Sequence, residues 1–147
     1  MFPDRRRSAG GAAAGATAAA VWALQQPLDM RLFGVAYDDT ELLGKFVTRS
    51  PAWRAAGIVI HVSFGAGLGA LYANLGARLP GPPAVRAPAF ALTEHLATWP
   101  GTRLLERLHP AAGDFPRLWG DHAAFAQATW RHLLFGVVLG ALEPRLR

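Results

Sequence analysis

Apolar stretches of helical length, separated by prolines and polar connections, divide this chain of 147 residues. They cover residues 9–27, 52–79, 85–105 and 122–142. An α-helix rises about 1.5 Å per residue, so about 20 apolar residues cross the hydrocarbon core of a bilayer. The pattern predicts an all-α fold: one integral membrane domain formed by a bundle of four transmembrane helices, with short interfacial helices in the two long outer connections.

Capping residues and prolines predict where these helices end. Ser8 is expected to cap the first helix, and Pro27 to kink or end it before an interfacial extension closed by Gly34. Ser50, which precedes a first-turn proline, predicts the start of the second helix. Asp121 is expected to cap the fourth helix.

The third helix has the shortest apolar segment. Its continuous part runs from Ala87 to Trp99, so it reaches the length of a span only if it continues past Pro100. An amphipathic segment follows Pro100, as another follows Pro27, and this parallel favours the continuation.

The remaining boundaries depend on acidic residues and one more proline. Asp38 and Asp39 are expected to cap a short helix in the first long connection, and Asp114 a turn in the second. The fourth helix is expected to end at Glu143 and Pro144.

One motif, H-x-x-F-G-x-x-x-G-A-L, occurs twice, beginning at His61 and at His132. The caps Ser50 and Asp121 keep the same register. The chain therefore reads as two similar halves, residues 1–80 and 81–147, each a pair of helices, and the predicted bundle consists of two parallel repeats.

Within each copy the histidine and both glycines lie one turn apart along one face of a helix. Small residues at this spacing let helix backbones approach closely in lipid. We therefore interpret the glycines as packing residues, and expect the second and fourth helices to pack on each other. The set, which includes a similar pair in the first helix, is Gly11, Gly15, Gly65, Gly69, Gly136 and Gly140.

Six polar side chains are expected to gather in the outer half of the bundle: Glu94, His95, Gln127, Arg131, His132 and His61. An unpaired charge inside a membrane is costly, so charged groups there are expected to find partners. This argument predicts an ion pair between Glu94 and Arg131 that joins the third and fourth helices.

Three interpretations of this polar cluster remain open. It could be a structural clasp, a route for protons, ions or small solutes, or a haem or metal site that uses His61 with His132 or His95. The glycines next to the histidines leave little room for a porphyrin, so no metal or cofactor is predicted. Sequence signatures of catalysis, such as G-x-S-x-G and H-E-x-x-H, do not occur, and with no cysteine there is no thiolate chemistry.

Composition modifies this interpretation only slightly. Hydrophobic residues make up 52% of the chain and charged residues 17%, against about 25% charged in average proteins. A mean hydropathy of +0.18 is modest because alanine and glycine fill much of the apolar sequence, so a soluble helical bundle remains the alternative. The net charge of +5 is spread over ends and connections without a basic face, which argues against nucleic acid as a partner.

Arginine density predicts the orientation. Arginines are concentrated near both termini and in the connection at residues 79–87, whereas the two long connections balance theirs with acidic residues. By the positive-inside rule both termini are cytoplasmic. The first helix also has the composition of a cleavable signal, although the repeat requires it as a permanent span.

Several segments resemble a group of small bacterial inner-membrane proteins that have no established activity. They are Tyr37-Asp38-Asp39 with Leu42-Leu43-Gly44, Glu94-His95-Leu96 with Trp99-Pro100, and the run from Ala124 to Gly136. The His-x-x-aromatic-Gly element is also distantly similar to YagU-type proteins. The resemblance implies a multi-pass protein of the bacterial inner membrane whose partners are the lipid bilayer and a second copy or another membrane protein. We therefore expect a non-enzymatic structural or partner-binding component, with a small transporter or channel as the alternative.

Overall fold

The computed structural model describes residues 4–146, in which all regular secondary structure is helical. This confirms the all-α prediction. Arg147, one of the arginines used to predict orientation, lies outside the described residues. The long helices are α1 (Arg5–Phe33), α3 (Trp53–Leu75), α4 (Pro83–Thr98) and α6 (His122–Leu146). The connections contain α2 (Asp39–Val47), α5 (Thr102–Leu108) and the 3-10 turns η1 (Gly76–Arg78), η2 (Trp99–Gly101) and η3 (Ala112–Asp114).

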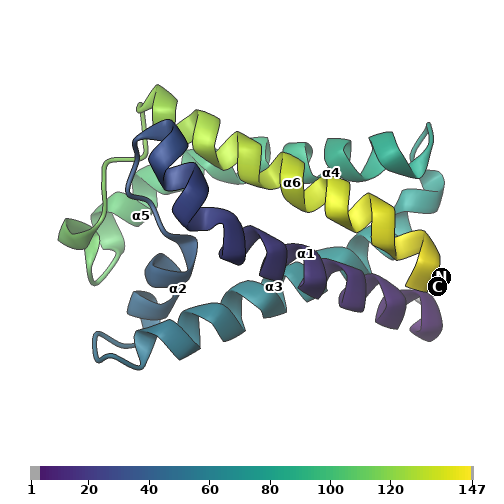
Figure 1. Ribbon diagram of the computed structural model, residues 1–147, viewed down its shortest axis with the longest axis horizontal. Helices are drawn as coiled ribbons and strands as arrows, with labels where there is room; N and C mark the ends of the chain where they lie inside the picture. Colours follow the sequence, from purple (N-terminus) through teal and green to yellow (C-terminus); the bar gives the residue numbers. More distant parts are fainter. Residues whose placement is uncertain (1–3, 147) are drawn as a thin grey trace.

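The two central helices are α1 and α6, which run side by side (Figure 1). Helix α3 packs on α1, α4 packs on α6, and α2 packs on the start of α3. Both chain ends lie at one end of the molecule, and α2 and α5 lie at the other (Figure 1).

Helix α1 is longer than the sequence predicted. Its cap is Asp4, whose carboxylate accepts the backbone N–H groups of Arg6 and Arg7, so the prediction of Ser8 as cap is wrong. The helix also continues through Pro27, because a proline removes only one backbone donor and tertiary contacts on both sides hold the segment helical. Gly34 does end the helix, with a left-handed φ of 69°.

Two of the predicted caps are confirmed. The Asp38 carboxylate accepts the N–H groups of Thr40 and Glu41 at the start of α2. Asp121 accepts the N–H of Ala124 at 2.9 Å at the start of α6.

Four other boundaries differ from the prediction. Helix α3 starts at Trp53, preceded by a turn in which the carbonyl of Ser50 accepts the Trp53 N–H. The third helix is not continuous to residue 105, because α4 ends at Thr98 and the chain reaches α5 through η2. Helix α6 passes through Pro144. Asp114 closes η3 instead of capping it.

The predicted glycines do allow close helix contact, but the predicted partner was wrong. A Cβ added at Gly15 would lie 2.1 Å from the Gly65 carbonyl oxygen, and one at Gly69 would lie 2.1 Å from that of Gly11. These are contacts between α3 and α1. A Cβ at Gly136 would lie 2.5 Å from the Cα of Pro88, on α4. Gly65 and Gly69 of α3 therefore face α1, and Gly136 of α6 faces α4, so these glycines do not face each other.

By length and hydropathy, one helix of the described chain, α3, qualifies as a candidate membrane span. The 16 residues of α4 are too few for the same criterion. Helix α1 contains more alanine and more charged residues than α3, and α6 contains more charged residues.

The close contact between α1 and α3 predicts opposite effects for two neighbouring glycines of α3. Replacing glycine by alanine inside a helix stabilises it by up to about 1 kcal/mol through helix propensity. Gly67→Ala should raise the melting temperature, because a Cβ there meets nothing within 4 Å. Gly69→Ala should lower it, because its Cβ would overlap the α1 backbone. Thermal unfolding followed by circular dichroism in detergent tests both; equal melting temperatures would contradict this packing.

Candidate functional site

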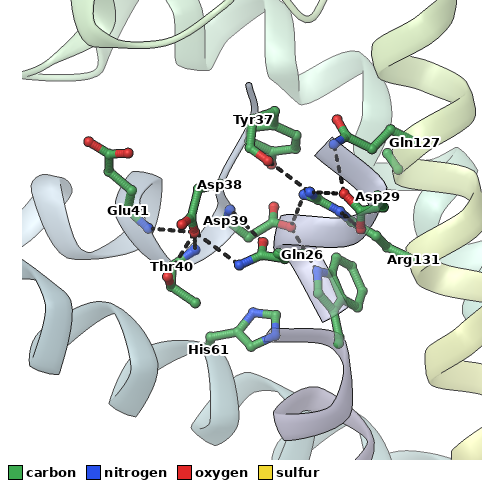
Figure 2. A network of polar contacts seen from close by, with 12 residues as sticks. Gln26, Asp29, Tyr37, Asp38, Asp39, Thr40, Glu41, His61, Gln127 and Arg131 are labelled. Carbon is green, nitrogen blue, oxygen red and sulfur yellow. Dashed lines mark hydrogen bonds and ion pairs between the residues drawn. The ribbon is translucent and has the colours of Figure 1, made fainter. Parts of the chain in front are cut away.

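A fully buried guanidinium lies on α6. The Arg131 side chain is 0% exposed, and its guanidinium donates to Asp29 on α1 and to Asp39 at the start of α2 (Figure 2). The distances are 2.8 Å from Nε to Asp29 Oδ2 and 2.8 Å from Nη1 to Asp39 Oδ2. Nη2 donates to Asp29 Oδ1 and, at 2.8 Å, to the carbonyl of Tyr37. One guanidinium thus joins α1, α2, α6 and the segment between α1 and α2.

A second set of polar groups supports the two carboxylates. Gln25 and Gln127 both donate to Asp29. Gln26 bridges the segment before α2, since its Oε1 accepts the Asp39 N–H and its Nε2 donates to Asp38 (Figure 2). We call Arg131, Asp29, Asp39 and these supporting residues the Arg131 cluster.

The predicted ion pair between Glu94 and Arg131 is wrong. Arg131 is paired with Asp29 and Asp39. Asp29 reaches it because α1 continues past Pro27, and Asp39 reaches it from the start of α2. Glu94 Oε2 instead lies 3.0 Å from Nε2 of His132, so Glu94 still joins the third and fourth helices through a different partner.

Hydrogen-bond partners define the protonation of three histidine rings. His61 Nε2 lies 3.1 Å from the carbonyl oxygen of Ala19, and His132 Nδ1 lies 2.7 Å from that of Ala128. A carbonyl only accepts, so each of these nitrogens carries a proton. His95 Nε2 likewise donates to Thr129 Oγ1, whose own hydroxyl donates to a backbone carbonyl. These bonds occupy Nε2 of His61 and His95 and Nδ1 of His132.

Trp22 stands between the two histidines of the repeated motif. Its ring centroid is 5.2 Å from that of His61 and 4.8 Å from that of His132, both in edge-to-face geometry. His95 stacks on His132 at 4.5 Å. The Trp22 indole N–H donates to Asp39 at 2.9 Å, which connects this group of rings to the Arg131 cluster.

A cavity of about 320 Å³ opens between α3 and α4, and all four long helices contribute to its wall. Its polar wall carries His61, Glu94 and His132, and its apolar wall carries aromatic and aliphatic side chains. A second cavity of about 220 Å³ lies toward α2 and η2. The two share Trp22, His61 and His132, so these rings stand between them.

Carboxylates outnumber the single guanidinium around the Arg131 cluster. Asp29 and Asp39 contact Arg131, and the neighbouring Asp38 bonds to Gln26 and to the start of α2 (Figure 2). Burial raises the pKa of the Tyr37 phenol well above its usual range, and the nearby Asp39 carboxylate adds to this shift, so Tyr37 stays neutral.

The two long connections are fastened to each other beside the site. Lys45 Nζ lies 2.7 Å from Asp114 Oδ2, and His109 Nε2 donates to the Leu42 carbonyl at 2.9 Å. The hydrogen bond to Lys45 lowers the pKa of the Asp114 carboxyl, and the same bond raises the pKa of Lys45. These contacts hold the second connection against α2.

The six residues predicted from the sequence divide between two neighbouring places. Glu94, His95, His132 and His61 gather around the rings and the first cavity, whereas Gln127 and Arg131 belong to the Arg131 cluster. Gln127 Oε1 has no hydrogen-bond partner among the described residues. The described chain contains no group of three or more histidine, aspartate or glutamate side chains arranged to hold a metal ion.

Sequence analysis missed the partners of Arg131. Trp22, Gln26 and Asp29 are spaced i, i+4 and i+7, the spacing of one helix face. This signal becomes visible only if the first helix is allowed to continue through Pro27.

The fold and site define an all-helical protein with a buried ion-pair cluster beside a cavity that opens between two helices. Comparison of the chain with protein-family models, with curated proteins and with solved structures finds no match in any of the three.

The saturation of Arg131 predicts a large stability loss when it is replaced. Arg131→Met leaves Asp29 buried without its counter-charge and should cost about 3–5 kcal/mol. Arg145→Met is the matched control, because Arg145 is exposed on the same helix. Denaturant unfolding in mixed micelles gives both values. Adding Asp29→Asn to Arg131→Met should recover part of the loss; equal losses for the two arginine variants would contradict the assigned role of the cluster.

Proposed function

We propose that the chain is an integral membrane protein whose helices α1, α3, α4 and α6 cross the bilayer as four spans. The placement of side chains supports this. On α1, Leu24 is 81% and Leu32 75% exposed, whereas Arg131 and Gln127 are fully buried. Proteins in water seldom bury charged side chains or expose many large apolar ones, whereas the long helices of this chain expose several leucines and Phe64 and bury Asp29 and Glu143 together with Arg131.

The modest hydropathy of three of the proposed spans has a structural cause. On these helices many alanines and the ion pair of Asp29 with Arg131 are buried, whereas large apolar side chains such as Leu24, Leu96 and Val137 are exposed. Helix α4 alone is about 24 Å long at 1.5 Å per residue, and η2 and α5 extend it toward the full thickness.

The glycine contacts support a construction from two parallel repeats. Gly65 and Gly69 of the first motif face α1 and Gly136 of the second faces α4, so each motif packs on the first long helix of its own half. A parallel repeat of four spans places both termini on one side of the membrane, which we assign to the cytoplasm of a bacterial inner membrane.

We assign to this protein a non-enzymatic binding role. The observation that carries this assignment is the cavity between α3 and α4. Its volume of about 320 Å³ lies at the lower end of the range of small-molecule sites, and its wall is mostly apolar with a few converging polar groups. A molecule dissolved in the bilayer would enter between the two helices. The Arg131 cluster, which is saturated and closed, serves as the structural clasp.

A transport role is the second candidate. The two cavities meet at Trp22, His61 and His132, so movement of these rings would join them into one path from the helix interface toward α2.

The membrane topology can be tested directly, because the native chain contains no cysteine. Ala84→Cys and Gly113→Cys place single thiols in the two opposite ends of the bundle. In intact spheroplasts a membrane-impermeant maleimide should label Gly113→Cys but not Ala84→Cys, and inverted vesicles should give the opposite pattern. Release of the wild-type protein from membranes by alkaline carbonate would contradict the four-span proposal.

The binding role predicts selective labelling of the cavity. A decyl alcohol that carries a diazirine, photolysed with the protein in phosphatidylcholine nanodiscs, should modify cavity residues identified by mass spectrometry. Leu68→Trp should reduce this labelling several-fold, because Leu68 lines the cavity. Leu71→Trp, at a position 48% exposed on the same helix, should leave it unchanged. Equal labelling of the two variants would refute the cavity as a binding place.

A further inference from the structure

We propose that the cavity between α3 and α4 takes a lipophilic cation, and that its arrival displaces the proton shared by Glu94 and His132. The proposal rests on the proposed binding role and names the class of ligand and the exchange that accompanies it.

His132 Nδ1 donates to the Ala128 carbonyl, and its Nε2 lies 3.0 Å from Glu94 Oε2. An imidazole nitrogen without a proton and a carboxylate oxygen are both acceptors and would repel at this distance, so the contact implies one proton between them. Whether this proton is on the imidazole or on the carboxyl, the pair is neutral. Removing it leaves a neutral imidazole beside a carboxylate, with a net charge of −1.

The cavity wall leaves polar atoms free to bind a ligand. His61 is 8% exposed, lines the cavity and uses Nε2 to donate to Ala19, so Nδ1 of the singly protonated ring is an acceptor with no partner in the described chain. Glu94 Oε1 is a second acceptor on the same wall. The Trp22 N–H is occupied by Asp39. The wall therefore offers acceptors and favours a head group that donates or is positively charged.

His95 stacks on His132, and His61 shares the cavity wall with the pair. Trp22 packs on His132 and donates to Asp39, which leads to the Arg131 cluster, where Asp29 and Asp39 hold the guanidinium. With Asp38 included, carboxylates exceed the guanidinium, so the local potential favours a cation over an anion.

The cavity also has an aromatic lining. Trp22, Phe64, Phe90 and Phe135 border the cavity. Aromatic faces attract ammonium and similar cations, most strongly where water is excluded. This lining accepts the apolar body of such a ligand and also stabilises its charge.

The exchange of the shared proton for the cation follows from the repulsion between their positive charges. A cation beside Glu94 would lie close to the proton that the carboxylate shares with His132. Loss of that proton to water removes the repulsion and leaves the carboxylate as the counter-charge. One positive charge enters as one proton leaves, so the net charge of the site does not change.

The test compares two ions of the same size and shape, tetraphenylphosphonium and tetraphenylborate. Binding to the wild-type protein in phosphatidylcholine nanodiscs is measured by calorimetry between pH 6 and pH 8, in buffers of different ionisation enthalpy. The cation should bind with release of about one proton, and its affinity should rise up to about tenfold per pH unit while the pair keeps its proton. The anion should show no binding beyond its uptake by protein-free nanodiscs of the same lipid.

Two variants assign the effect to the pair. Glu94→Gln should remove both the proton release and the pH dependence. Glu41→Gln, which changes the same charge on α2 away from the cavity, should keep both. The proton count on the wild-type protein remains decisive if Glu94→Gln does not fold.

The outcomes separate the two proposals. Binding of the anion as tight as that of the cation, or cation binding without proton release, would overturn this inference, while cavity labelling by the decyl alcohol would keep the binding role. Failure of both ions and of the alcohol probe would overturn both.

Discussion

The burial of one guanidinium determines how the rest of this molecule is arranged. A charge without water must be surrounded by partners, and Arg131 finds them on three separate segments. The end of α1, the start of α2 and the middle of α6 must therefore converge on the same point. The neighbouring core consists largely of alanine, which packs closely but specifies little about register. The directional hydrogen bonds to the Arg131 guanidinium fix the register of these helices.

Along the rest of the bundle, small residues bring the helix backbones into close contact. Gly15 and Gly69 bring the backbones of α1 and α3 into contact, and Gly136 does the same for α6 and α4. Helices that touch through glycine leave no space for side chains between them. The space that remains in the bundle is therefore found where α3 and α4 face each other, and the cavity forms there.

Sequence patterns predicted the helical class, several caps, the packing role of the glycines and the neighbourhood of the polar residues. They did not predict which helix covers each glycine face, because periodicity identifies the face that packs but not the helix that packs on it. Local sequence patterns could not identify the partners of Arg131 either. The pairing with Asp29 depends on α1 continuing through Pro27, and that continuation depends on the tertiary bonds of Gln26 and Asp29. The predicted pair of Glu94 with Arg131 was wrong, because the choice between Arg131 and His132 as the partner of Glu94 depends on side-chain geometry.

Trp22 contacts both the cavities and the Arg131 cluster. Its ring borders both cavities, while its indole N–H donates to the same Asp39 oxygen that accepts from Arg131. Any rotation of the ring that enlarges either cavity must stretch or break this bond, and Asp39 is the first residue of α2. The volume available between the helices and the position of the short helix at the end of the bundle are therefore mechanically coupled through a single side chain.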